Sequence, residues 1–186
     1  RRGDARLYRE FEVSIPREIP EDERLVVVEA WAAERLVSRG MVVDVALHDV
    51  PARDGGRTVH AHVLATDRPL DATTANGFAA RKDRRWNSAE LVEEARSSWA
   101  EHANRALQRA RSTSRVDHRS LEAQRGDALA RGDQSAADEL MRVPEPKIGV
   151  AAKAIAKRAP GTSWRRRAWD QVRQANRAMQ AAFARL

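Results

Sequence analysis

The chain of 186 residues contains no cysteine. Disulfide bonds and thiolate metal ligands are therefore excluded, and the protein needs no oxidising compartment. The sequence also has no apolar run long enough to cross a bilayer and no secretory signal among its first residues. We therefore expect a cytoplasmic protein that is not inserted into a membrane.

Aromatic residues are scarce, at 5% of the chain, and only one of them is a tyrosine, Tyr8. Any chemistry that needs a tyrosine hydroxyl from within this sequence must therefore use Tyr8. A tyrosine hydroxyl is suited to nucleophilic attack, so Tyr8 is a candidate for that role.

Basic residues exceed acidic ones, 34 against 27, but the excess lies in residues 151–186, which contain nine lysines and arginines and one aspartate. Such a tail can neutralise DNA phosphates without reading bases, although a solvated helix face explains any single arginine equally well. Two indoles within the tail favour binding, because indoles can stack on exposed bases. The candidate nucleic-acid contacts are Trp164, Arg165, Arg166, Arg167 and Trp169.

Three of the five histidines, His48, His60 and His62, lie within one short interval. Residues 41–48 and 57–66 are rich in β-branched side chains, which is typical of strands, and the Asp-Gly-Gly sequence between them suits a hairpin loop. Because side chains alternate along a strand, this hairpin would place all three imidazoles on the same face of a sheet. We therefore predict a three-histidine metal site.

An earlier strand is predicted over residues 7–15, where polar and apolar residues alternate. If its polar face lies on the histidine side, Glu10 or Glu12 can accept the second ring N–H of a ligand histidine or serve as a base. Single histidines on strands usually have other roles, but their grouping on one face favours a metal. A cupin-type site would need a glutamate a few residues downstream, and none lies between His62 and Asp71.

Two helices are predicted to cover the valine-rich face of this sheet, opposite the histidines. The first begins after Pro20 with an acidic turn and runs toward Gly40; the second begins at Asn87, where Glu90 completes a possible capping box. His102, on the second helix, is expected to be a core or groove histidine. The apolar stripes comprise Leu25, Val28, Ala32 and Leu36 in the first helix and Leu91, Ala95, Trp99, Ala103, Ala106 and Ala110 in the second.

The expected fold is of the α/β (α+β) class: an antiparallel sheet with helices packed on one face and the metal site on the other, followed by a helical tail. Residues 1–124 would form the catalytic-core portion. Residues 125–146 are typical of a linker with a short helix near 136–142, and residues 147–186 of a basic helical extension. The helical spacing of apolar residues continues to Leu186, so we expect the natural protein to extend further.

Six segments of the sequence share a family-specific order and spacing. They are Tyr8–Glu18, Val45–His48, Val59–Val63, Trp86–Asn87, Trp99–Leu107 and Val116–Gln124. Together they resemble the MobA/MobL (MobQ-type) conjugative relaxases, which belong to the wider His-hydrophobic-His endonuclease group. The resemblance covers about residues 7–124, so it is more specific than any single motif.

This resemblance implies a bacterial, cytoplasmic DNA-nicking enzyme that cleaves and rejoins one strand at a plasmid origin of transfer. In the family a tyrosine attacks the scissile phosphate, forms a phosphotyrosine link to the 5′ end and releases a 3′ hydroxyl. His48, His60 and His62 would hold a divalent metal, Mn²⁺ or Mg²⁺, with Zn²⁺ as a further alternative. The implied partners are single-stranded DNA at the transfer origin, other relaxosome proteins and type IV coupling proteins.

Two departures from the family pattern bear on function. The family's catalytic tyrosine lies well before the glutamate strand, whereas this sequence begins at Arg1 and has only Tyr8, so we expect that segment to be missing. Tyr8 stands where relatives often carry another aromatic or apolar residue, which favours a packing or groove-lining role. Thr58-Val59 replaces the Asn-Pro that is common before the histidine pair.

Two alternative functions remain open. One is a non-catalytic module that retains the metal and binds single-stranded DNA. The other is a rolling-circle replication initiator or transposase of the same histidine group. That second alternative would need a tyrosine on a helix after the histidine pair, and the sequence has none there.

Overall fold

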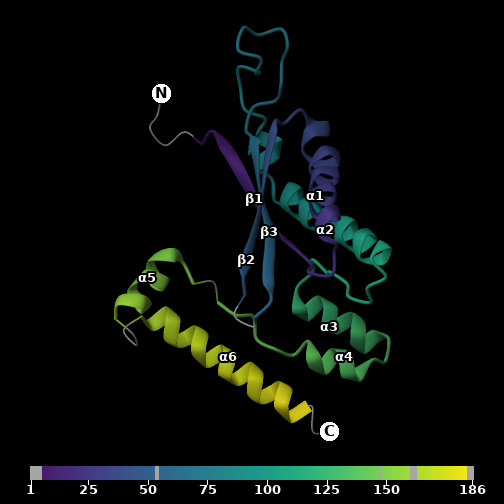
Figure 1. Ribbon diagram of the computed structural model, residues 1–186, viewed down its shortest axis with the longest axis vertical. Helices are drawn as coiled ribbons and strands as arrows, with labels where there is room; N and C mark the ends of the chain where they lie inside the picture. The colour runs from purple at the N-terminus through teal and green to yellow at the C-terminus, as the bar shows by residue number, and fades with distance from the viewer. Residues whose placement is uncertain (1–5, 53–54, 147, 160–162, 184–186) are drawn as a thin grey trace. The chain divides into compact units, whose positions relative to one another are not determined.

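The computed structural model describes residues 6–52, 55–146, 148–159 and 163–183 (Figure 1). The chain folds as two compact units, Arg1–His118 and Arg119–Leu186. The amino-terminal unit contains the sheet and the three grouped histidines, and the carboxyl-terminal unit is helical. The expectations about the two chain ends concern Arg1 and Leu186, which lie outside the described residues.

Three antiparallel strands form the sheet, β1 (Tyr8–Ile15), β2 (Val43–Pro51) and β3 (Arg57–Thr66), in the order β1-β3-β2. A hairpin joins β2 to β3, and Gly55 in its loop has a φ of +82°. That left-handed conformation costs glycine little because it has no Cβ. The predicted antiparallel sheet is confirmed, and β3 is its central strand.

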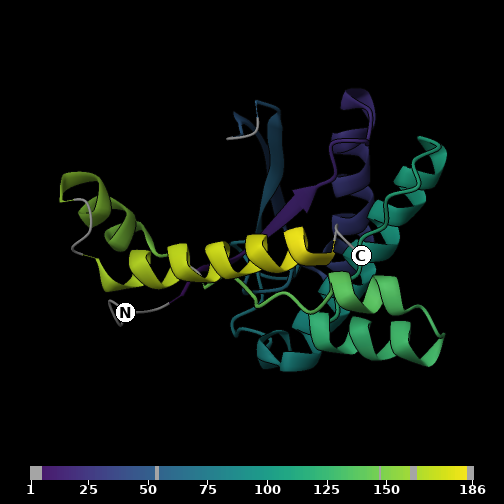
Figure 2. The same ribbon diagram turned by 90° about the horizontal axis from the view of Figure 1, so that it is seen from below.

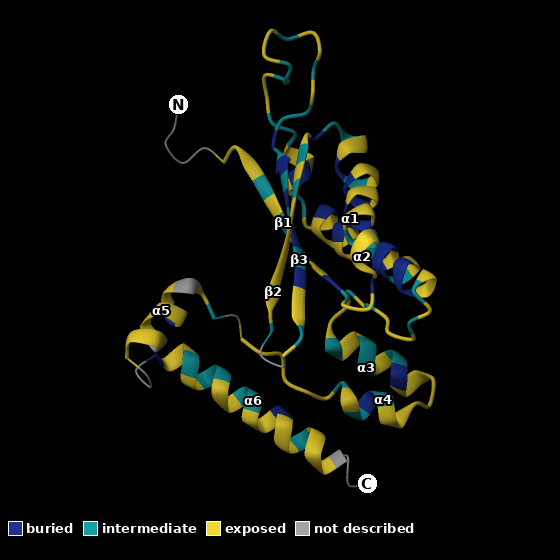
Figure 3. Cartoon of the chain, in the orientation of Figure 1, coloured by how far each residue is buried: buried dark blue, intermediate teal, exposed yellow. Residues whose placement is uncertain are grey.

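Burial alternates along β3 from Thr58 to Thr66, and Figure 3 marks the buried part of this strand in dark blue. Val59, Ala61, Val63 and Ala65 are buried, and the side chains between them point to the opposite side. One apolar face and one polar face are what an antiparallel strand covered on a single side requires. We call the polar side the open face. Its residues are Tyr8, Glu10, Glu12 and Ser14 on β1, Asp44, Ala46 and His48 on β2, and His60, His62, Leu64 and Thr66 on β3.

Helices α1 (Glu21–Arg35) and α2 (Ala89–Arg109) lie on the same side of the sheet (Figure 1, Figure 2). Trp31 of α1 packs edge-to-face against Trp99 of α2 and Phe11 of β1, with ring centroids 5.7 and 5.9 Å apart. The Trp31 indole N–H donates to a carbonyl of α2 at 3.3 Å, so this buried ring has a partner for its polar atom. The prediction that both helices cover the valine-rich face, opposite the histidines, is confirmed.

Parts of the predicted helix pattern are wrong. Leu25 is exposed, because the buried stripe of α1 is displaced toward Val27 and Trp31. Ala110 is only half-buried, because it is the C-cap that follows the last residue of α2. The first helix also ends earlier than expected, and a separate 3-10 turn, η1 (Val37–Arg39), follows it.

The cap of α2 also differs from the prediction. Ser88, not Asn87, is the N-cap, and its hydroxyl accepts a hydrogen bond from the backbone N–H of Leu91 at 3.2 Å. Asn87 instead ends a 3-10 turn, η2 (Arg84–Asn87), and its side-chain carbonyl accepts a hydrogen bond from Arg9 at 3.1 Å. A tertiary contact from β1 therefore occupies the residue that looked like a cap.

The segment 125–146 differs from the expected linker with one short helix. It contains the second half of one helix and all of the next, and these two pack together with Ala128 and Ala137 buried. Their caps, Ser120 and Asp133, accept backbone hydrogen bonds through their side chains. The described helices of this unit are α3 (Leu121–Ala130), α4 (Gln134–Glu139), α5 (Val150–Arg158) and α6 (Trp164–Phe183).

One side chain ties α6 to the segment that precedes α5. Asn176 accepts a hydrogen bond from the Val143 backbone N–H at 2.9 Å and donates one to the Val143 carbonyl at 2.8 Å. Because Asn176 is buried, this two-way pairing satisfies its polar atoms. In the described parts of the chain, no helix is both long and apolar enough to pass through a membrane.

A buried carboxylate links the end of β3 to the start of β1. Asp67 is 2% exposed and forms ion pairs with Arg6 at 2.7 Å, Arg9 at 3.0 Å and Lys82 at 3.3 Å. Burial alone raises the pKa of the Asp67 carboxyl, but the hydrogen bonds from the three cations outweigh burial and hold that pKa below its ordinary value. Arg9 also donates to the Trp86 carbonyl, so the cluster fixes the chain that leads into α2.

Asp67→Asn should lower the free energy of unfolding by about 2 kcal/mol at pH 7, since three cations lose their shared anion. A depressed folded-state pKa contributes stability above the ordinary value of about 3.9. The difference from the parent chain should therefore shrink as the pH falls below about 4. Urea unfolding followed by circular dichroism measures both effects. As a control, Asp49→Asn, in a more exposed ion pair, should cost at most about 1 kcal/mol; equal unfolding of Asp67→Asn and the parent chain at pH 7 would contradict the account.

Candidate metal centre

His48, His60 and His62 come together on the open face, where β2 pairs with β3. His48 and His60 are cross-strand partners, and His62 is two residues further along β3. The ring centroids are 4.5, 5.1 and 5.3 Å apart, and one ligand nitrogen from each ring lies within 4.8 Å of the others. The structure therefore brings together the three histidines that the sequence grouped.

A carboxylate from the neighbouring strand contacts this cluster. The Nδ1 atom of His62 lies 2.5 Å from Oε1 of Glu10 on β1. If Nδ1–H donates to this carboxylate, the ring's Nε2 carries a lone pair that is free to bind a metal. Glu12, the other candidate, is the direct cross-strand partner of His62 on the same face. Among the described residues, the carboxylate that is hydrogen-bonded to the cluster is that of Glu10.

The donor set fits a divalent metal. Three imidazoles leave coordination positions open, as metals that act on a substrate require. His48 is exposed, and His60 and His62 are half-buried, so a substrate could approach the cluster from solvent. The rings also contact one another rather than the apolar core, which lies on the other side of the sheet.

The open face is acidic around the histidines. Glu10, Leu64 and Asp44 occupy one row across the three strands, and Glu12, His62 and Ala46 occupy the next. With neutral imidazoles, the three carboxylates make this part of the face negative, which attracts a divalent cation and repels a phosphate. The sequence did not single out Asp44, since only the strand register reveals that it is level with Glu10.

Tyr8 lies on the open face but far from the histidines. It is the first residue of β1, is 55% exposed and pairs with Thr66, which is four residues beyond His62 on β3. At about 3.3 Å per residue, Tyr8 is about 13 Å along the sheet from His62. This separation favours the groove-lining role for Tyr8 over the nucleophilic one.

The two histidines outside the cluster have structural partners. His102 is buried, with Nδ1 2.9 Å from the Ser98 carbonyl and Nε2 3.2 Å from the Glu34 carboxylate. The prediction of a core histidine is therefore confirmed. Nε2 of His118 lies 3.2 Å from Glu93 of α2.

The sequence profile of the MobA/MobL family matches residues 1–158. The chain belongs to the MobA/MobL family. It is 29% identical to Mobilization protein A of Escherichia coli over 66% of this chain and 19% of that protein. It is 27% identical to Conjugal transfer protein TraA of Agrobacterium fabrum over 86% of this chain and 14% of that protein. Identity to Mobilization protein MobL of Acidithiobacillus ferridurans is 28%, over 92% of this chain and 48% of that protein.

A solved structure also resembles this member of the MobA/MobL family. It was described under the heading "Molecular Basis of Vancomycin Resistance Transfer in Staphylococcus aureus" and superposes with a TM-score of 0.52 at 28% identity. The match covers 61% of this chain and 57% of that chain. Because the chain spans less than half of each curated relative named above, the activity of the whole relatives is carried over only as a proposal.

The two candidate indoles on α6 differ in their surroundings. Trp164 is 67% exposed, with the Arg165 guanidinium 5.4 Å from its ring. Trp169 is half-buried, and the guanidinium groups of Arg166 and Arg173 each lie 4.5 Å from its ring. Trp164 is therefore better placed than Trp169 to stack on a base. The two contacts of Trp169 follow from helical spacings of three and four residues, which bring side chains to the same side of a helix.

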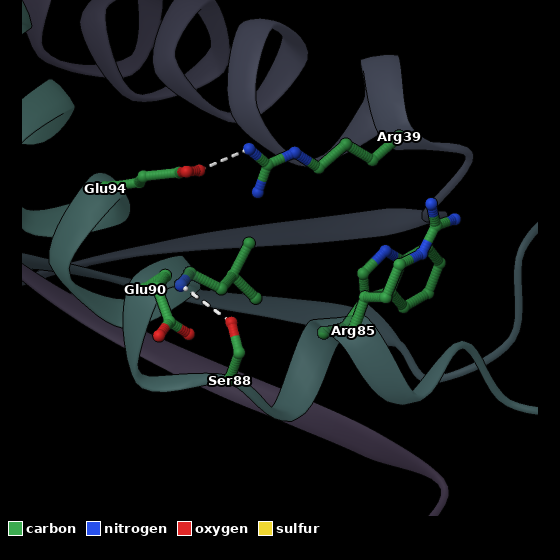
Figure 4. A pocket seen from close by; sticks show the side chains of 7 residues that line it. Arg39, Arg85, Ser88, Glu90 and Glu94 are labelled. Carbon is green, nitrogen blue, oxygen red and sulfur yellow. Dashed lines mark hydrogen bonds and ion pairs between the residues drawn. The ribbon is translucent and has the colours of Figure 1, made fainter.

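A polar pocket also opens between η1, η2 and the start of α2 (Figure 4). Arg39 and Arg85 line it together with Ser88, Glu90 and Glu94. Arg39 already pairs with Glu94, and the Ser88 hydroxyl already caps α2. Its polar groups are thus used within the fold, and the pocket lies apart from the open-face histidines.

Glu10→Gln should weaken Mn²⁺ binding by about tenfold or more, because an amide is a weaker partner for the ring N–H of His62 than a carboxylate. Glu12→Gln is the matched control, since it removes one negative charge from the same face without removing that hydrogen bond. Isothermal titration calorimetry with Mn²⁺ measures both affinities. Equal losses in the two variants would show that only overall charge matters and that Glu10 does not orient His62.

Proposed function

We propose that this chain is the metal- and DNA-binding core of a conjugative relaxase, which cleaves and rejoins one DNA strand at a plasmid origin of transfer. The observation that carries the proposal is the convergence of His48, His60 and His62 on a solvent-facing sheet surface, with Glu10 at His62. The names of the relatives support it, including a 43 kDa relaxation protein of Salmonella typhimurium that is 29% identical over 66% of this chain.

In the proposed reaction the three histidines hold a divalent cation, Mn²⁺ or Mg²⁺, with Zn²⁺ as the alternative. When bound, the cation would polarise the non-bridging oxygens of the scissile phosphate and stabilise the charge that develops there. Glu10 keeps the His62 ring in one tautomer and orientation, because its carboxylate accepts the Nδ1 proton. The open face gives an extended DNA strand access to these groups.

The nucleophile of the proposed reaction is a tyrosine hydroxyl from outside this sequence. Its oxygen forms a bond to the scissile phosphorus as the bond from phosphorus to the 3′ oxygen breaks. The tyrosine hydroxyl gives up its proton, and the leaving 3′ oxygen takes up one proton to become a hydroxyl. Tyr8 does not serve, because it is about 13 Å along the sheet from His62. Reversing the same exchange rejoins the strand.

Single-stranded DNA at the transfer origin is the proposed substrate, and other relaxosome proteins and a type IV coupling protein are the proposed partners. Along α6, exposed Trp164 together with Arg165, Arg166 and Arg167 would contact bases and phosphates of that strand. Trp169 would contribute to this surface by packing against the guanidinium groups of Arg166 and Arg173.

A second candidate function is a non-catalytic module that binds a metal and single-stranded DNA. The distance of Tyr8 from the histidines favours it, because the nucleophile is then absent from the chain itself. The two candidates give different results with an oligonucleotide that carries the cognate transfer origin. A relaxase produces a cleaved strand attached to protein, whereas the module binds the strand intact.

In the complete natural protein, His60→Ala and His62→Ala should each lower cleavage of that oligonucleotide by about 100-fold or more, since a ligand contributes at least as much as its outer partners. His118→Ala is the matched control, because His118 lies away from the open face, and it should cleave normally. Gel electrophoresis of the covalent adduct in Mn²⁺ gives the rates. Undiminished cleavage by the His60 and His62 variants, or loss of the adduct in Tyr8→Phe, would overturn the assignment.

A further inference from the structure

A second pocket lies at the end of the sheet where β1 begins and β3 ends. It has a volume of about 270 Å³, and we call it the sheet-end pocket. Tyr8 is adjacent to two of its lining residues, because Leu7 precedes it in the chain and Thr66 is its cross-strand partner. The lining residues used below are Arg6, Leu7, Thr66, Arg68, Phe78 and Lys82.

The sheet-end pocket is cationic, unlike the surface around the histidines. Arg6, Arg68 and Lys82 line it, and none of its described lining residues carries a carboxylate. The anion paired with two of these cations is Asp67, which is buried and shared by Arg6, Lys82 and Arg9. Because one carboxylate cannot neutralise these cations together with Arg68, the pocket keeps an excess of positive charge that suits an anionic ligand.

The surface beside these cations is apolar and aromatic. Leu7, which is 68% exposed, and Phe78 line the pocket. Leu70, which is 57% exposed, pairs with Phe78 in an isolated β-bridge, and Tyr8, which is 55% exposed, follows Leu7 in the chain. A ligand that needs both a stacking surface and a cation, within a few ångströms of each other, is a nucleotide of a single strand. Base-paired DNA would keep its base faces inside the duplex, so it fits this surface less well.

The spacing relative to the histidines suits one continuous strand. Thr66 in the pocket is four residues beyond His62, or about 13 Å along β3. A strand that lies along the open face with one phosphate at the histidines can therefore place a later nucleotide in the sheet-end pocket. The acidic row of Glu10 and Asp44 lies between the two positions and disfavours a phosphate there.

We propose that the sheet-end pocket is a nucleotide subsite for single-stranded DNA, in which Arg68 contacts a phosphate and Tyr8 and Phe78 stack on a base. This inference rests on the proposed function, because it assumes that the open face binds single-stranded DNA. It gives Tyr8 a positioning role: the subsite sets which phosphate of the strand lies at the histidines.

The test measures binding of a fluorescein-labelled oligodeoxythymidine of about 12 nucleotides by fluorescence anisotropy, with the complete chain and Mn²⁺. Tyr8→Ala should weaken binding by about fivefold or more, as expected for the loss of one stacked base, and Tyr8→Phe should retain it. Arg68→Ala should reduce the slope of log affinity against log salt by about 0.7. Arg105→Ala, an equal charge change on α2 on the other side of the sheet, is the control and should leave the slope unchanged.

The inference is overturned if Tyr8→Ala and Arg68→Ala behave like Arg105→Ala, or if the parent chain does not bind the oligonucleotide. Photocrosslinking of a 5-iodouracil oligonucleotide should yield adducts at Tyr8 or Phe78, and adducts found only elsewhere would also overturn it. Circular dichroism melting checks that each variant folds.

Mn²⁺ calorimetry separates failure of the subsite from failure of the proposed function. The subsite alone is disproved if the parent chain binds Mn²⁺, His60→Ala does not, and the Tyr8 and Arg68 variants bind DNA as the parent chain does. Absence of Mn²⁺ binding to the parent chain removes the proposed metal centre, whatever the DNA result. Intact Mn²⁺ binding by Tyr8→Ala with weakened DNA binding supports both.

Discussion

The pairing of His48 with His60 across β2 and β3 is the constraint on which the candidate centre depends. A shift of this register by one residue would turn His48 toward the apolar core and separate it from the other two rings. The register is maintained from the opposite face, where Val59, Ala61 and Val63 are buried under α1 and α2. Packing of the core therefore aligns the imidazoles from the opposite face of the sheet.

The same sheet separates charge along its length. Three carboxylates surround the histidines, whereas arginines and a lysine gather where β1 and β3 meet the loop that leads to η2. A phosphate is repelled at the first place unless a cation neutralises it, and it is attracted at the second. Protein cations in the sheet-end pocket would accordingly hold a DNA strand on the open face. A phosphate of that strand would approach the three histidines only when a metal is bound there.

How much the sequence could predict follows from the range of each interaction. Alternation along residues 57–66 depends on local chemistry, so it predicted the strand, its two faces and the shared side of the histidines. The choice between Glu10 and Glu12 needed the register of β1 on β3 and a side-chain conformation, which no local pattern contains. Asn87 was wrongly predicted as a cap, because its side-chain carbonyl accepts a hydrogen bond from Arg9, nearly eighty residues away in the sequence. A local pattern cannot show such a contact. The helix α3 was not predicted, because its stability depends on packing against α4, whereas the short helix α4 was predicted two to three residues too far along the chain.

The most direct test of the central claim is the anomalous diffraction of crystals of this chain grown with Mn²⁺. The account predicts a single strong manganese peak on the open face, bonded to one nitrogen from each of His48, His60 and His62, with the Glu10 carboxylate on the far nitrogen of His62. A peak bonded to other groups, or the three rings turned away from one another with no manganese between them, would contradict it.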